Sequence, residues 1–213
     1  MSYAVKEMFL TLQGEGKQAG RRALFLRFAG CNLWSGREVD RASAICTFCD
    51  TDFVGTDGEK GGRFADAEAL ADAVAALWAG DERERFAVVT GGEPMLQLDT
   101  ALIDALHARD FEIAVESNGT LPATPGIDWL CISPKAGSTV VQRSGDELKL
   151  VWPQPDIDPA ALIGWDFGAH LVQPMDCGDP VCNAAAREAA IALVMADPRW
   201  RLTLQTHKLL GLK

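Results

Sequence analysis

Positive charge is scarce in this sequence of 213 residues: 20 lysine and arginine residues stand against 30 aspartate and glutamate residues, which gives a net charge of −10. Nucleic-acid-binding surfaces normally need a basic stripe, so this balance argues against nucleic acid as a partner. Long apolar runs are missing as well, since none approaches the roughly 18 residues of a membrane span. Residues 1–7 lack the basic and apolar blocks of a signal peptide. We therefore expect a cytoplasmic protein without a membrane partner.

Internal repeats, low-complexity tracts and linkers are also missing from the sequence. A chain of this length fits one domain, whose core can bury most of its apolar surface without help from disulfides. We therefore expect residues 1–213 to form a single domain.

Apolar runs typical of strands recur along the chain, whereas helical spacing is convincing in only three places. The strand-like runs cover residues 23–28, 86–89, 113–115, 129–132, 148–151, 170–172 and 202–204. The helical stretches cover residues 65–78, 98–108 (with Asp99 as the expected cap) and 183–195. Strands that alternate with helices predict a parallel α/β fold. Because the stretches after Ser117 and Ser133 are short and rich in Pro, Gly and Ser, we expect a barrel-like sheet with an incomplete helical layer.

Polar segments follow six of the expected strands at the point where each strand ends. They are the cysteine loop that begins after Ala29 and residues 90–93, 117–119, 133–135, 173–176 and 205–207. In barrel-type α/β sheets, functional sites collect at the carboxyl ends of the strands. The sequence therefore predicts one large site to which all six segments contribute.

Three of the six cysteines crowd one loop, with fourteen residues between Cys31 and Cys46 and two between Cys46 and Cys49. Three thiolates can hold three irons of a [4Fe–4S] cluster, which leaves the fourth iron open to a cofactor or substrate. A zinc half-site and a thiol redox pair are the alternatives. The loop holds no histidine as a further zinc ligand, although Asp50 or Asp52 could serve, and the pair does not open a helix directly after a strand. The spacing alone leaves these alternatives open.

The residues around the cysteines carry a family resemblance. Residues 28–37 read Phe-Ala-Gly-Cys-Asn-Leu-Trp-Ser-Gly-Arg, and residues 46–53 read Cys-Thr-Phe-Cys-Asp-Thr-Asp-Phe. These segments resemble the radical S-adenosylmethionine (SAM) superfamily and, more narrowly, its 7-carboxy-7-deazaguanine synthases. The gap between the first two cysteines departs from the usual three-residue spacing and is similar to a variant of this family with an insertion, here at residues 32–45. From residues 5–16 to 205–208, the resemblance covers nearly the whole chain.

The resemblance implies a fold and an activity. The fold would be a partial, incomplete TIM-like barrel of about six parallel strands with a reduced helical layer. The activity would be that of a radical SAM lyase, which converts 6-carboxy-5,6,7,8-tetrahydropterin to 7-carboxy-7-deazaguanine with loss of ammonia, in queuosine and 7-deazapurine biosynthesis. The cofactors would be a [4Fe–4S] cluster, SAM used catalytically, and Mg²⁺. A flavodoxin-like one-electron reductant and a homodimer would complete the assembly.

The resemblance also implies a SAM pocket. Residues 90–94, Thr-Gly-Gly-Glu-Pro, look like the family's methionine-binding segment, because glycine permits close approach of the backbone. An ordinary Gly-Gly turn is the alternative, and Phe48 could lie against the adenine or serve packing alone. The implied SAM residues are Phe48, Gly91, Gly92, Glu93, Ser117, Ser133, Lys135, Gln173, Pro174, Met175 and Asp176.

Substrate and Mg²⁺ residues follow from the same resemblance. A glutamate can accept from the guanidine-like N–H groups of a pterin, and Arg27 can bind a carboxylate with two hydrogen bonds or point to solvent. The implied substrate residues are Leu12, Gln13, Gly14, Glu15, Arg27, Thr90 and His207. Thr51 is the expected Mg²⁺ ligand, with Asp50 and Asp52 as competitors.

The remaining cysteines have no counterpart in the resemblance. We expect Cys131 to lie in the core as a small hydrophobe, whereas Cys177 and Cys182 could pair or bind a second metal. Two other functions stay open at this stage. One is an activating enzyme for a glycyl-radical partner, which usually has three residues between its first two cysteines. The other is a non-catalytic zinc-binding module.

Overall fold

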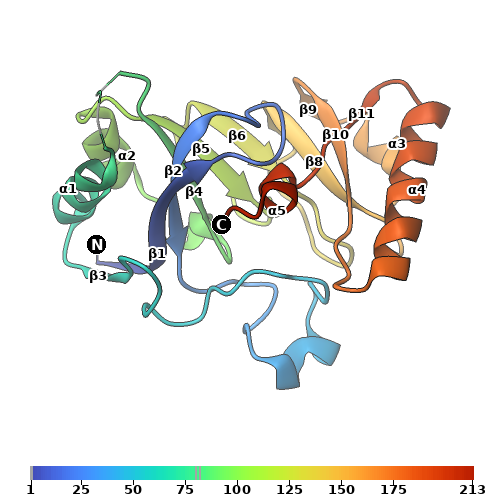
Figure 1. Cartoon of the computed structure of the whole chain (residues 1–213), viewed down its shortest axis with the longest axis horizontal. Coiled ribbons are helices and arrows are strands. Elements are labelled where there is room, and N and C mark those ends of the chain that lie inside the picture. Colours follow the sequence, from blue (N-terminus) through green and yellow to red (C-terminus); the bar gives the residue numbers. More distant parts are fainter. Residues whose placement is uncertain (1, 80, 82) are drawn as a thin grey trace.

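A computed structural model of the chain, which describes residues 2–79, 81 and 83–213, contains a large mostly parallel sheet (Figure 1). In the described residues this sheet has nine strands in the order β11-β10-β8-β6-β5-β4-β2-β1-β3. Seven of them run parallel: β2 (Arg22–Phe28), β4 (Phe86–Gly91), β5 (Glu112–Ser117), β6 (Trp129–Ile132), β8 (Glu147–Trp152), β10 (His170–Pro174) and β11 (Trp200–Leu202). The predicted partial barrel with a parallel sheet is confirmed.

The edge of the sheet beyond β2 differs from the prediction. There β1 (Tyr3–Leu12) pairs with β2 in antiparallel fashion, and β3 (Gly62–Phe64) pairs with β1. The pairing of β1 shifts register between Val5 and Glu7. This bulge breaks the alternation of buried and exposed residues, which explains why residues 3–12 do not read as a strand.

Helices are few, as predicted. The three long ones are α1 (Ala67–Leu77), α2 (Thr100–His107) and α4 (Pro180–Ala196). Asp99 caps α2 by accepting a hydrogen bond from the Leu102 amide at 3.0 Å, which confirms the expected cap. The short elements are α3 (Pro159–Leu162), α5 (Thr206–Leu210), the 3₁₀ helices η1 (Glu38–Ser43) and η2 (Pro94–Leu96), and the paired strands β7 (Ser144–Gly145) and β9 (Asp166–Phe167). Among the described residues, none of the helices combines the length and apolarity needed to cross a membrane.

The two faces of the sheet differ in polarity. One face is apolar: Leu24, Leu26 and Val89 are fully buried in a cluster with residues of α1 and α2. A second cluster packs β8 and β10 against α4. The opposite face carries charged side chains and is covered by α5 and by the loop of residues 29–61, both visible in front of and below the sheet in Figure 1. The face of the sheet that carries the charged side chains is therefore the place to look for a functional site.

Candidate functional site

A cavity of about 610 Å³ lies on the polar face of the sheet. Most of the predicted site residues line it: Leu12, Gln13, Glu15, Arg27, Cys31, Cys46, Phe48, Cys49, Thr51, Thr90, Gly91, Gly92, Ser117, Ser133, Lys135, Gln173, Pro174, Asp176 and His207. Three predicted residues, Gly14, Glu93 and Met175, are not among the residues that the structure places on its wall. Met175 instead borders a second, more open hollow that also touches Phe48 and Cys49.

The cavity extends beyond the carboxyl ends of the parallel strands. The cysteine loop and residues 90–92, 117 and 133 lie at those ends, as predicted. Residues 13–15, however, follow the antiparallel strand β1, whose last residue Leu12 pairs with Arg22 at the start of β2. The cavity therefore runs along the inner face of the sheet, from the strand ends that carry the cysteines to the opposite edge.

The three loop cysteines share the wall of this cavity as free thiols. The Cys46 thiol donates a hydrogen bond to Cys49, which lowers the pKa of Cys49 although burial opposes the shift. The Arg41 guanidinium donates to the carbonyl oxygens of Thr47 and Cys49 at 3.0 and 3.1 Å and so holds the turn between these two cysteines.

The spacing of the sulfurs argues against a single zinc ion. Among the described residues, Cys31, Cys46 and Cys49 do not form a group with all ligand atoms within 4.8 Å of one another, as a tetrahedral zinc site would require. The two proposed extra zinc ligands already face ammonium groups: Asp50 lies 2.6 Å from Lys208, and Asp52 lies 2.8 Å from Lys6. Three separate thiols on one cavity wall are instead the donor set that a cubane cluster takes.

The glycines of the 90–94 segment allow a close approach to the cysteine loop. A Cβ atom on Gly92 would lie 2.3 Å from the Gly30 carbonyl oxygen and 2.6 Å from Cys31 Cβ, so a larger residue would push the two loops apart. The Glu93 amide donates to the same carbonyl oxygen at 3.0 Å. Gly92 therefore lets the Cys31 loop pack closely against this segment, and both glycines border the cavity.

Glu93 is fully buried and joins two loops rather than facing the cavity. Its carboxylate accepts hydrogen bonds from the Ser117 hydroxyl at 2.9 Å and from the amides of Asn118 at 2.8 Å and Met95 at 2.9 Å. Burial raises the pKa of Glu93 although these donors favour the carboxylate. The structure thus gives Glu93 a positioning role for the loop that ends β5.

Two polar side chains of the predicted SAM pocket, Lys135 and Gln173, could form further hydrogen bonds. Lys135 donates to the carbonyl and hydroxyl oxygens of Ser133, both at 2.7 Å, and burial lowers its pKa. Its ammonium nitrogen lies 6.0 Å from the centre of the Phe48 ring. The buried Oε1 atom of Gln173 has no hydrogen-bond partner, although Gln173 lines the cavity. Buried polar atoms are normally paired, so both groups are suited to a polar ligand.

Lys208 of α5 ties two walls of the cavity together. Its ammonium group lies 2.6 Å from Asp50 in the cysteine loop and 2.6 Å from Asp176 after β10. Lys208 lowers the pKa of Asp176 to about 2, with the amides of Gly178 and Asn183 assisting. The neighbouring pair, Cys177 and Cys182, forms a disulfide, the first of the two alternatives considered for these residues.

Charged side chains alternate along the inner face of the sheet. Arg27 donates to Glu7 at 3.0 Å, so it faces the cavity and not the outer solvent. Farther along, Lys149 lies 2.6 Å from Glu15 and 2.8 Å from Glu116. Burial alone would raise the pKa of Glu15, but the charge and hydrogen bond of Lys149 lower it to about 2.

Gly14 lets α5 close over the cavity. A Cβ atom there would lie 2.2 Å from Nδ1 and 2.7 Å from the backbone nitrogen of His207. The amide and hydroxyl of Thr206 both donate to the Gly14 carbonyl oxygen, at 2.9 and 2.8 Å. His207 is thereby held at the cavity wall, and burial lowers its pKa.

Sequence reasoning missed several charged residues of the cavity: Glu7, Glu116, Lys149 and Lys208. The signal that singled out Arg27, a charge inside an apolar strand, is also present for Glu116 in β5 and Lys149 in β8.

Thr51, the expected Mg²⁺ ligand, lines the cavity next to Asp50, with 3.4 Å between its hydroxyl and a carboxylate oxygen. Cys131 is buried, as expected.

Comparison with known proteins gives full-length matches. The chain is 61% identical over 212 residues to the 7-carboxy-7-deazaguanine synthase of Caulobacter vibrioides and 58% identical over 212 residues to that of Bordetella pertussis, covering 100% of both chains in each case. The crystal structure of QueE from Escherichia coli has the same fold: TM-score 0.67 and 24% identity, over 96% of this chain and 94% of that one. No protein-family model matches the chain.

Proposed function

Because the chain belongs to the family of 7-carboxy-7-deazaguanine synthases, we propose that it converts 6-carboxy-5,6,7,8-tetrahydropterin to 7-carboxy-7-deazaguanine with loss of ammonia. It would act as a radical SAM carbon–nitrogen lyase in queuosine and 7-deazapurine biosynthesis. Relatives that are 53–61% identical over the whole chain carry the synthase name, so neither the glycyl-radical activating enzyme nor the zinc module is favoured.

One observation supports this proposal most strongly. Three free cysteines and a row of charged side chains line a single cavity, so a cluster with its cofactor and a polar substrate could meet there. When bound, the [4Fe–4S] cluster and SAM would supply the 5′-deoxyadenosyl radical, which is chemistry of the cofactor and not of the side chains. The protein's contribution is binding, orientation and exclusion of water.

We propose that Cys31, Cys46 and Cys49 hold the cluster and that the SAM residues named above hold the cofactor, with Glu93 acting through the loops that it positions. Lys135 would meet the SAM carboxylate, because among the described residues its half-buried ammonium group has only Ser133 as a partner within hydrogen-bonding distance. The unpaired Oε1 atom of Gln173 would accept from an N–H or O–H group of the ligand.

The pterin would lie at the other end of the cavity. Gln13 and Glu15 offer a donor and acceptor pair for its guanidine-like edge, and Arg27 offers a guanidinium for its carboxylate. Leu12, Gly14, Thr90 and His207 would complete this end. His207, whose pKa is lowered by burial, would be the neutral ring that accepts or donates one hydrogen bond.

The finer features of the family complete the proposal. Mg²⁺ would bind at the Thr51 hydroxyl together with substrate oxygens, a flavodoxin-like protein would supply the electron, and two copies would form a homodimer in the cytoplasm. Residues 1–213 would act as one domain that carries the cluster-loop insertion at residues 32–45.

The proposal is tested by anaerobic incubation of reconstituted protein with SAM, dithionite and 6-carboxytetrahydropterin, followed by mass spectrometry. We expect 7-carboxy-7-deazaguanine from the wild type and none from Cys31→Ser. The matched control is Cys177→Ser, which lies outside the thiol set and should retain turnover. Wild-type protein that has a full complement of iron but forms no deazaguanine would refute the proposed reaction.

A further inference from the structure

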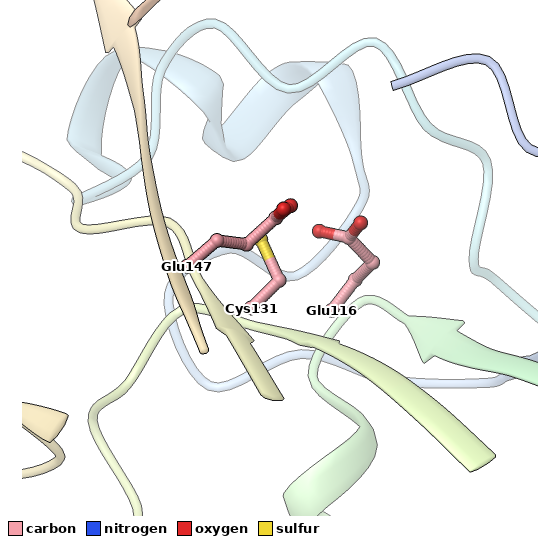
Figure 2. Close-up of side chains that lie close together, drawn as sticks. All are labelled: Glu116, Cys131 and Glu147. Carbon is pink, nitrogen blue, oxygen red and sulfur yellow. The ribbon is translucent and has the colours of Figure 1, made fainter. Parts of the chain in front are cut away.

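A second group of titratable side chains lies behind the charged row of the cavity. Glu116, Cys131 and Glu147 come from the neighbouring strands β5, β6 and β8, and their ligand atoms lie within 4.8 Å of one another. Figure 2 shows the Cys131 sulfur beside the Glu147 carboxyl group, with the Glu116 carboxyl group facing them from the neighbouring strand. Glu116 lines the cavity, whereas Cys131 and Glu147 are buried, at 1% and 2% exposure. The group therefore extends from the wall of the cavity, at Glu116, to the buried residues behind it.

The place that a cation would take beside this group is already filled. The ammonium nitrogen of Lys149 lies 2.8 Å from Glu116 and 2.6 Å from Glu15, and its side chain is only 5% exposed. Although burial opposes it, the charges of Glu116 and Glu15 raise the pKa of Lys149 well above its usual value. Lys149 thus stays charged and supplies the positive charge that a metal ion would supply.

One positive charge does not balance three carboxylates. If Glu15, Glu116 and Glu147 were all ionised beside Lys149, two uncompensated negative charges would lie close together in a largely buried group, which is unfavourable. Glu15 is the member held ionised by Lys149. For Glu147, burial and the charge of Glu116 raise the pKa, although Lys149, the Lys17 amide and the Cys131 thiol oppose the shift. Glu147 is the site where a proton relieves the repulsion.

Glu147 also anchors the segment proposed to bind the pterin. Its Oε2 atom accepts a hydrogen bond from the Lys17 amide at 2.9 Å. A Cβ atom on Gly16, which has a φ of +69°, would lie 2.2 Å from Glu147 Oε1, so only glycine lets the segment settle onto this carboxyl group. The Gly16 amide donates to the Thr203 hydroxyl at 2.9 Å. Glu147 therefore holds residues 16 and 17, which directly follow the segment 13–15.

We propose that Glu147 is a positioning residue that acts as a neutral acid: it holds residues 13–17 through the Lys17 amide and holds Glu116 through the Cys131 thiol. The Cys131 sulfur lies within 4.8 Å of an oxygen of each carboxyl group, so its S–H can donate to Glu116 while a protonated Glu147 donates to the sulfur. Among the described residues, the charged and titratable groups that face Glu147 are Glu116 from β5, Cys131 from β6 and Lys149 from β8. Through them Glu147 would set the pterin end of the cavity without touching the pterin. This inference rests on the proposed function.

Kinetics of the reconstituted holoenzyme separate this role from a general structural one. We expect Glu147→Ala to raise the KM for the pterin about tenfold, the size of one lost buried hydrogen bond, while the Kd for SAM stays unchanged. Glu147→Gln, a neutral isostere, should keep the wild-type KM near neutral pH. In the wild type the KM should rise once the pH exceeds the pKa of Glu147, because a second negative charge then faces Glu116. Glu147→Gln should remove that rise.

The control variant is Glu112→Gln, which alters a glutamate at the other end of β5 that pairs with Arg21. SAM binding and cluster absorbance report whether each variant has folded. A Glu147→Gln enzyme as impaired as Glu147→Ala, a KM rise with pH that survives in Glu147→Gln, or a Glu147→Ala enzyme with the wild-type KM would overturn the inference.

Infrared spectroscopy tests the proton independently of turnover. At neutral pH the wild type should show a protonated carboxylic acid band that is missing from Glu147→Gln and present in Glu112→Gln. A spectrum without this difference contradicts the inference even if the enzyme is active. If the wild type shows the band and makes no deazaguanine, the proposed function fails while the protonation of Glu147 stands.

Discussion

Charges that lie inside β-strands define the chemistry of this cavity at the level of single residues. Arg27, Glu116 and Lys149 each interrupt an apolar strand, and each has a partner of opposite charge within 3.0 Å. A buried charge without a partner costs several kcal/mol, on the order of a large part of the stability of a small domain. Each of these charges is therefore paired in the structure, and the pairs lie where a polar ligand could bind.

The first residue-level prediction concerns Arg27. We expect Arg27→Ala to raise the KM for the pterin about tenfold to a hundredfold, because hydrogen bonds to a charged group contribute about 1.5–3 kcal/mol. The Kd for SAM, measured by isothermal titration, should not change. Arg22→Ala is the matched control, since Arg22 belongs to the same strand but stacks on Trp78 outside the cavity. A wild-type KM in Arg27→Ala would remove Arg27 from the pterin site.

The second residue-level prediction concerns Mg²⁺. We expect turnover to be stimulated by added Mg²⁺ after chelation and expect Thr51→Ala to lose that response, because the hydroxyl would be the protein ligand. Thr56→Ala, in the same loop but away from the cavity, serves as the control. Activity that is independent of Mg²⁺ in thoroughly chelated wild type excludes the Thr51 role.

Some of these residues could be predicted from the sequence and others could not. Cys31, Cys46 and Cys49 lie in one loop, and Arg27 is a charged residue inside an apolar strand. Each of these features is visible in the neighbouring sequence and indicates a site residue. The pairing of Lys149 with Glu116 requires knowing that β6 lies between β5 and β8 and that their side chains face one side. Strand order is a long-range property, which no local pattern specifies.

At the level of elements, α5 acts as the cover of the cavity. Its five residues are too few to show a helical period, so the sequence does not predict this helix.

The bounds of other elements also differ from the prediction. The strand β11 lies two residues before its predicted position, and α4 begins at Pro180 after the Asp179 cap, three residues before its predicted start. Apolar periodicity thus located the long elements, whereas their ends depend on caps and neighbours.

Lys208 provides the test of this cover. Lys208→Ala removes the ammonium group between Asp50 and Asp176 and leaves two carboxylates facing each other across the cavity. Because the group is partly exposed and such pairs contribute little individually, we expect the Kd for SAM to rise only about threefold. Arg199→Ala, which removes a surface pair with Asp197, should leave the Kd unchanged. An unaltered Kd in Lys208→Ala would show that α5 does not support the SAM end.

The cap of α2 is a second element-level test. Asp99 accepts hydrogen bonds from the Leu102 amide at 3.0 Å and from the Tyr3 hydroxyl at 2.6 Å, whereas Asp66 caps α1 by accepting from the Ala69 amide at 2.9 Å. We expect Asp66→Ala to lower the free energy of unfolding by about 1 kcal/mol. Asp99→Ala should lower it by about 2–3 kcal/mol, because it also strands a buried hydroxyl. Urea denaturation compares the two, and equal losses would contradict the added role of Tyr3.

At the level of the whole molecule, the antiparallel strand β1 gives the sheet two functional ends. The parallel strands end at the cysteine loop, and β1 runs the other way, so residues 13–17 are delivered to the opposite edge. The inner face between them carries the charged row. A cofactor bound at one end and a substrate held at the other could therefore meet over the middle of the sheet.

The most direct test of this arrangement is electron–nuclear double resonance spectroscopy on the reduced, reconstituted protein with SAM labelled in its amino and carboxylate groups. If Cys31, Cys46 and Cys49 hold three irons and leave the fourth open, the labelled nuclei should couple to the cluster. Adding the pterin should preserve that coupling while turnover begins. A reconstituted cluster that shows no coupling to either label would contradict the central claim.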